Sequence, residues 1–132
     1  MNKVIRASLA IIALSTVFFV SAAVIAKKEQ VRHVVIFKFK PTTTPEQIDQ
    51  VTQELGALKS KIPGIVSFEH GVNDSPEKKN LGFTHAYLIT FENAAARDTY
   101  LPHPEHKKFG QMLGKLGVMD DVFVVDYAPE SK

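Results

Sequence analysis

The stretch Val31–Phe39, which reads VRHVVIFKF, decides the predicted fold. Its β-branched and aromatic residues are typical of a strand, in which alternate residues point to opposite faces. Both faces of this strand are apolar in the middle, so we expect each face to be covered. The odd positions are Val31, His33, Val35, Phe37 and Phe39, and the even positions are Arg32, Val34, Ile36 and Lys38.

Helix and strand signals continue on the C-terminal side of this stretch. The segment Thr44-Pro45-Glu46-Gln47 is typical of a helix start, with an N-cap, a proline at the first helical position and a glutamine that closes a capping box. Apolar residues then recur at helical spacing as far as Ile62, and Pro63-Gly64 ends the helix. Two strands are predicted over residues 65–72 and 83–91, with a polar loop between them.

The C-terminal part predicts a second helical region and a last strand. Asn93 is a typical N-cap for a short helix over residues 94–100, and a second helix is predicted over residues 105–116. The last strand is predicted over residues 118–127. The order β-α-β-β-α-β is the split βαβ arrangement of an α+β fold. Its helices cover only one face of the sheet, so we expect Val34 and Ile36 on the other face to pair with a second copy of the chain.

The N-terminus has the pattern of an export signal. Lys3 and Arg6 are followed by an apolar run without charges, residues 7–20, and then by small side chains suited to cleavage. We expect residues 1–26 to be a signal peptide, cleaved after Ala26 or alternatively after Ala23. Residues 27–132 then form one domain that is exported to the periplasm or secreted. The alternative is an uncleaved membrane anchor, because a spanning helix needs about 20 apolar residues.

Composition excludes several classes of protein. The chain has 132 residues and no cysteine, which excludes disulfide frameworks, cysteine nucleophiles and iron–sulfur clusters. Removal of the signal peptide leaves 14 basic and 14 acidic residues in the domain. A neutral domain argues against nucleic acid as a partner, because phosphate binding needs a basic surface. No membrane partner is expected after cleavage.

Four segments resemble the stress-responsive dimeric α/β-barrel (Dabb) family. They are VRHVVIFKFK, GFTHAYLITFE, VFVVDY and, most specifically, the segment Tyr100-Leu-Pro-His103-Pro-Glu-His106. The resemblance covers residues 31–129 and implies a ferredoxin-like monomer whose sheet pairs with its twin in a dimeric α/β barrel. It implies a stress-response protein, and most members of the family have no assigned chemistry.

The resemblance also implies candidate site residues. In a plant polyketide cyclase of this family, the catalytic tyrosine and histidine match Tyr100 and His106 here. The pocket residues of that enzyme match His33, Val35, Phe37, His85, Tyr87 and His103. The cyclase also has a tryptophan in its pocket, whereas this chain has none, so its substrate does not carry over to this protein.

The chemistry of the tyrosine–histidine pair suggests what such a site could do. A neutral imidazole takes a proton from the carbon beside a carbonyl, and a phenol stabilises the resulting enolate oxygen. We therefore expect a small apolar or aromatic carbonyl ligand to bind between sheet and helices. The alternative function is that of a cyclase, isomerase or lyase, without a cofactor and without a metal. The structural alternative is that His103 and His106 cap helix ends.

Overall fold

A computed structural model describes residues 29–130 of the chain. The predicted signal peptide lies outside these residues. The elements are β1 (Val31–Phe39), α1 (Pro45–Lys61), β2 (Ile65–Val72), β3 (His85–Phe91), α2 (Ala94–Tyr100), α3 (Pro104–Leu116) and β4 (Met119–Tyr127). This order confirms the predicted β-α-β-β-α-β arrangement, with α2 and α3 together forming the second helical connection.

Three predicted boundaries differ from the observed ones, and one of these is the start of β4, which begins at Met119 rather than at Val118. β3 begins at His85 rather than at Phe83, because the Phe83 N–H bonds to the Asn80 carbonyl within the preceding turn (2.8 Å). α3 begins at Pro104 rather than at Glu105, because His103 accepts a hydrogen bond from the Glu105 N–H and so takes the N-cap position. The predicted capping box of α1 is present, with Thr44 and Gln47 bonded to each other's backbone N–H.

The four strands form one antiparallel sheet in the order β2-β3-β1-β4. β1 is therefore an inner strand, paired on both sides. The register places His33 opposite Ile89 of β3 and opposite Asp126 of β4. Residues that lie opposite each other point to the same face, so Asp126 and His33 share a face although they are far apart in sequence.

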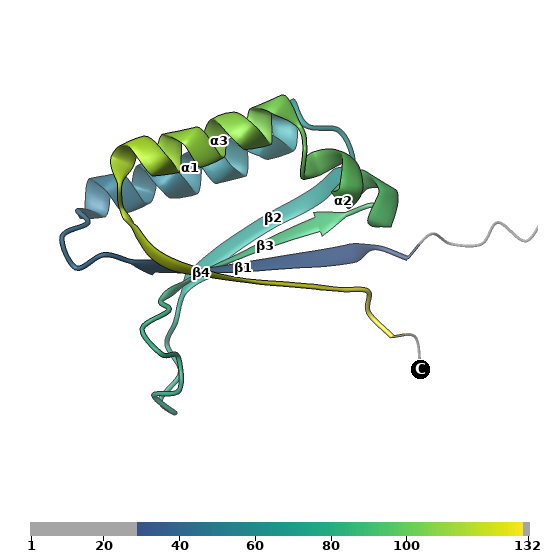
Figure 1. Ribbon diagram of the computed structural model, residues 1–132. Coiled ribbons are helices and arrows are strands. Elements are labelled where there is room, and N and C mark those ends of the chain that lie inside the picture. The colour runs from purple at the N-terminus through teal and green to yellow at the C-terminus, as the bar shows by residue number, and fades with distance from the viewer. Residues whose placement is uncertain (1–28, 131–132) are drawn as a thin grey trace, which may run out of the picture.

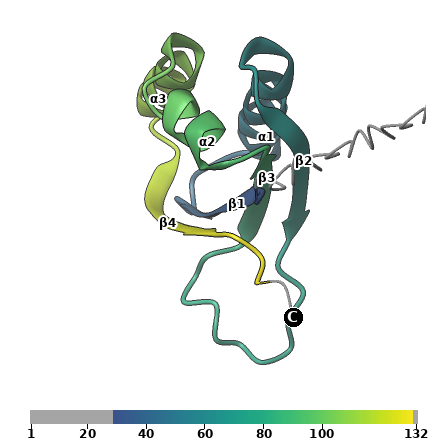
Figure 2. The same ribbon diagram turned by 90° about the vertical axis from the view of Figure 1, so that its right-hand side faces the viewer.

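All three helices lie on one side of the sheet (Figures 1 and 2), and the loop between β2 and β3 extends away from them. The odd positions of β1 face the helices and are buried from Val31 to Phe37. They pack in the core with Val51, Leu55 and Leu58 of α1. Within residues 29–130, no helix is long and apolar enough to cross a membrane.

The opposite face of the sheet carries no helix (Figure 2), as predicted. Val34 and Ile36 lie on it and are half-buried. The register adds Phe123, Val125 and Tyr127 of β4, which are 41–52% exposed. We call this side of the sheet the bare face.

Candidate functional site

Tyr100 lies at the centre of a cluster formed by three elements. It is the last residue of α2, and its side chain is almost completely buried, at 1% exposure. Its ring centroid is 5.9 Å from that of His33 on β1 and 4.3 Å from that of His106 on α3. The fold thus brings together three of the predicted site residues: the predicted catalytic pair and one predicted pocket histidine.

The hydrogen bond of His106 determines where this residue can accept a proton. Its Nδ1 lies 3.0 Å from the backbone carbonyl oxygen of Leu101, which ends α2. A carbonyl oxygen only accepts, so Nδ1 carries a hydrogen and donates it. In the neutral ring, Nε2 then holds the free lone pair and is the basic nitrogen. The same bond ties α3 to the end of α2, as the structural alternative predicts.

The hydroxyl of Tyr100 makes no hydrogen bond to another residue between 29 and 130. In the same part of the chain, no fully buried side-chain nitrogen or oxygen lacks a partner. This indicates that the small exposed area of Tyr100 includes its hydroxyl. Burial raises the pKa of this phenol, so it stays protonated and keeps an O–H that can donate.

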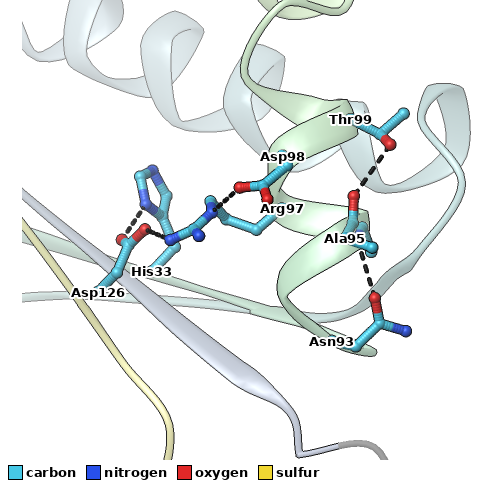
Figure 3. Close-up of polar contacts among 8 residues, drawn as sticks. His33, Asn93, Ala95, Arg97, Asp98, Thr99 and Asp126 are labelled. Carbon is cyan, nitrogen blue, oxygen red and sulfur yellow. Dashed lines mark hydrogen bonds and ion pairs between the residues drawn. The ribbon is translucent and has the colours of Figure 1, made fainter.

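A polar chain reaches the cluster from the other side (Figure 3). His33 is 5% exposed, and its Nδ1 lies 2.6 Å from Oδ1 of Asp126. The second oxygen of Asp126 lies 2.6 Å from Nη1 of Arg97 on α2. Arg97 also donates from Nε to Asp98 at 2.7 Å. Burial raises the pKa of Asp126, but the hydrogen bonds from Arg97 and His33 outweigh it and hold this pKa below its usual value.

Asp126 and Arg97 were not predicted as site residues. A signal for Asp126 exists in the sequence, because a single acidic residue among VFVVDY is unusual in a strand. Its partner could not be identified in this way, because the register of β4 against β1 decides which residue lies opposite it. Arg97 gives no such signal, since an arginine on a short polar helix is ordinary.

The other predicted histidines lie outside the Tyr100 cluster. His103 is the N-cap of α3 and accepts from the Glu105 N–H at 3.2 Å. His85 lies opposite Phe37, which is four positions along β1 from His33, a distance of about 13 Å. The ring of His85 packs edge-on against Phe39, with centroids 5.0 Å apart, and burial lowers its pKa.

The predicted apolar wall belongs to the core beside the cluster. Val35, Phe37 and Tyr87 are buried, with exposures of 1–8%. The Tyr87 hydroxyl bonds to Oγ1 of Thr52 on α1 at 2.8 Å, and its ring lies against Phe37. Among residues 29–130, no group of three or more histidine or carboxylate side chains is arranged to hold a metal ion.

Comparisons with known proteins agree with this fold. A family model described as the stress responsive A/B barrel domain, Dabb, matches residues 31–129. The chain is 35% identical to the stress-response A/B barrel domain-containing protein HS1 of Arabidopsis thaliana over 104 residues, 79% of this chain and 94% of that protein. It is 27% identical to olivetolic acid cyclase of Cannabis sativa over 99 residues, 75% of this chain and 96% of the cyclase.

Solved structures show the same similarity. Hydroxynitrile lyase from Passiflora edulis superposes with a TM-score of 0.71 at 27% identity, covering 79% of this chain and 96% of the lyase. A dimeric ferredoxin-like protein of unknown function from Jannaschia sp. CCS1 superposes with a TM-score of 0.65 at 29% identity, covering 76% and 99% of the two chains. These matches confirm the predicted family and fold. The chain therefore belongs to the stress-responsive A/B barrel domain family, Dabb.

Proposed function

We propose that this protein is an exported homodimer that binds a small apolar or aromatic carbonyl compound at Tyr100. The observation that carries the proposal is a buried phenol whose O–H makes no hydrogen bond within the described residues. Because the small exposed area of Tyr100 includes this hydroxyl, a ligand that arrives from solvent can accept a hydrogen bond from it. A carbonyl oxygen accepts a hydrogen bond, and the surrounding rings of His33, Phe91 and His106 suit an apolar or aromatic body.

A homodimer is supported by the bare face. Monomeric proteins rarely leave a large continuous apolar patch exposed. β4 also lies at the edge of the sheet, where one of its two sides has no partner strand. A hollow of about 420 Å³ on this face lies between Ile36, Ala86, Phe123 and the loop after β2. A second copy would fill it and cover the apolar side chains. The dimeric state of the Jannaschia relative also supports a dimer.

A second candidate function is acid–base catalysis on an enolisable carbonyl compound. The observation that favours it is the bond from His106 Nδ1 to the Leu101 carbonyl, because it leaves Nε2 as a base beside Tyr100. Nε2 would remove a proton from the carbon next to the carbonyl, and the Tyr100 O–H would donate to the enolate oxygen. The cyclase and lyase among the relatives are consistent with chemistry of this kind.

Replacing Tyr100 with phenylalanine tests ligand binding. We expect Tyr100→Phe to weaken the binding of benzaldehyde about tenfold, because it removes the donor and keeps the packing. Calorimetry on the full chain measures the dissociation constant, and thermal melting checks the fold. Tyr127→Phe is the matched control, since Tyr127 lies on the bare face and should leave the constant unchanged. Equal binding by Tyr100→Phe and the unsubstituted protein would reject the proposed site.

Export is tested on the protein from its native cell. The apolar run after Lys3 and Arg6 leads us to expect a mature chain that begins at Lys27, or at Val24 if cleavage follows Ala23. Mass spectrometry of the intact protein measures this start directly. A chain that retains Met1 in a soluble cytosolic fraction would contradict export, and one that retains it in the membrane fraction would indicate the uncleaved anchor.

A further inference from the structure

We propose that the ligand of this site carries a hydroxyl group as well as a carbonyl, and that His33 accepts a hydrogen bond from that hydroxyl. This inference rests on the proposed binding of a carbonyl compound at Tyr100. It is carried by the chain of polar contacts that links Arg97, Asp126 and His33 (Figure 3).

The direction of each hydrogen bond in this chain is determined. A guanidinium only donates and a carboxylate only accepts, so Arg97 donates to one oxygen of Asp126. The other oxygen, at 2.6 Å from His33, must accept from Nδ1. Nδ1 therefore carries the hydrogen, and the neutral ring presents Nε2 as an acceptor. The chain thus sets the polarity of a buried imidazole.

The ion pair with Arg97 keeps this polarity in place. It occupies the second carboxylate oxygen, which leaves Asp126 one orientation in which both oxygens are bonded. It also keeps the carboxylate ionised, since a protonated Asp126 could donate to His33 instead. Arg97 is held in turn by Asp98. Arg97 is therefore a positioning residue that acts on the ligand through Asp126 and His33.

A ligand with two polar groups would match the donor of Tyr100 and the acceptor of His33. The ring centroids of His33 and Tyr100 are 5.9 Å apart, so one small molecule can contact both. The Tyr100 O–H donates, which suits a carbonyl oxygen, and His33 Nε2 accepts, which suits a hydroxyl. A bound ligand that covers Nε2 of His33 and offers no donor removes this acceptor from water, which costs free energy, so the site should discriminate against a ligand that lacks the hydroxyl hydrogen.

Replacing Asp126 with asparagine should reverse the polarity of His33. Arg97 still only donates, so it should select the side-chain oxygen of the new amide. The NH₂ group then faces Nδ1 of His33, which must accept. The hydrogen of the neutral ring moves to Nε2. This nitrogen accepted a hydrogen bond from the ligand in the unsubstituted protein, and in the variant it donates one instead. Asp121→Asn is the matched control, because it makes the same change at an exposed residue of β4 that bonds to the Val122 N–H and belongs to no part of the polar chain.

The experiment compares hydroxybenzaldehydes with the corresponding methoxybenzaldehydes, in the ortho, meta and para series, by calorimetry on the full chain. We expect at least one hydroxyl compound to bind about tenfold more tightly than its methoxy counterpart. Asp126→Asn should reduce this ratio to about one, because the acceptor is lost. Asp121→Asn should leave the ratio unchanged. The methoxy group is bulkier than the hydroxyl in every measurement. Comparing the ratio between the unsubstituted protein and the variants therefore cancels the effect of this bulk.

Nitrogen NMR of the unsubstituted protein tests the polarity directly, even if Asp126→Asn fails to fold. The neutral ring of His33 should carry its hydrogen on Nδ1, and a hydrogen on Nε2 would overturn the proposal. Tyr100-dependent binding of benzaldehyde without a preference for hydroxyl over methoxy would overturn this inference alone. If no aldehyde binds at all, the proposed function fails and this inference fails with it.

Discussion

His106→Asn should lower the rate of proton exchange at the methyl carbon of acetophenone about 100-fold, if the protein catalyses enolisation. The physical reason is the loss of the basic Nε2. Asparagine is the informative substitution, because its NH₂ group can replace Nδ1 as the donor to the Leu101 carbonyl and so keep the tie between α2 and α3. Proton NMR in heavy water measures the exchange above the buffer rate.

Tyr100→Phe should lower the same rate roughly 100- to 1000-fold, because one donor to a developing oxyanion is removed. The double variant, which combines Tyr100→Phe with His106→Asn, should have about the same rate as the slower of the two single variants. The two losses should not add, since both residues serve one transition state. His70→Ala is the control, because this exposed histidine lies on β2 and outside the Tyr100 cluster. If all variants exchange at the same rate and the substitutions at Tyr100 and His106 lower the melting temperature, these two residues have only a structural role.

Val34→Asp combined with Ile36→Asp should abolish the dimer. Both side chains lie on the bare face of an inner strand, where a second copy would bury them. An unpaired buried carboxylate costs several kcal/mol, about enough to raise the dimer dissociation constant more than 100-fold for each substitution. Light scattering at several concentrations should therefore report a monomer, or the variant should be insoluble.

An insoluble double variant would leave open whether the fold or the dimer had failed. Phe123→Asp distinguishes failure of the fold from failure of the dimer. Phe123 is 52% exposed in the single chain, so its replacement should leave the protomer folded. Gln111→Asp adds the same charge on an exposed position of α3 and should not affect assembly. A folded, monomeric unsubstituted protein would contradict the proposed dimer.

The sequence by itself determined the order and type of the elements. The capping box at Thr44, the N-cap at Asn93 and the alternation along Val31–Phe39 are local signals, and the helix starts and the strand follow from neighbouring residues alone. Sequence also predicted that Val34 and Ile36 lie on a face without helices, because alternation and the element order are enough to decide it.

Only the tertiary structure decided which of the predicted histidines meet Tyr100. His85 shares a face with His33 yet lies at the other end of β1, and His103 is used as a helix cap. These outcomes depend on strand register and on how α3 turns away from α2. The pair formed by His33 and Asp126 is separated by 93 positions in sequence. Such a contact results from the packing of β4 against β1, and no pattern within either strand contains it.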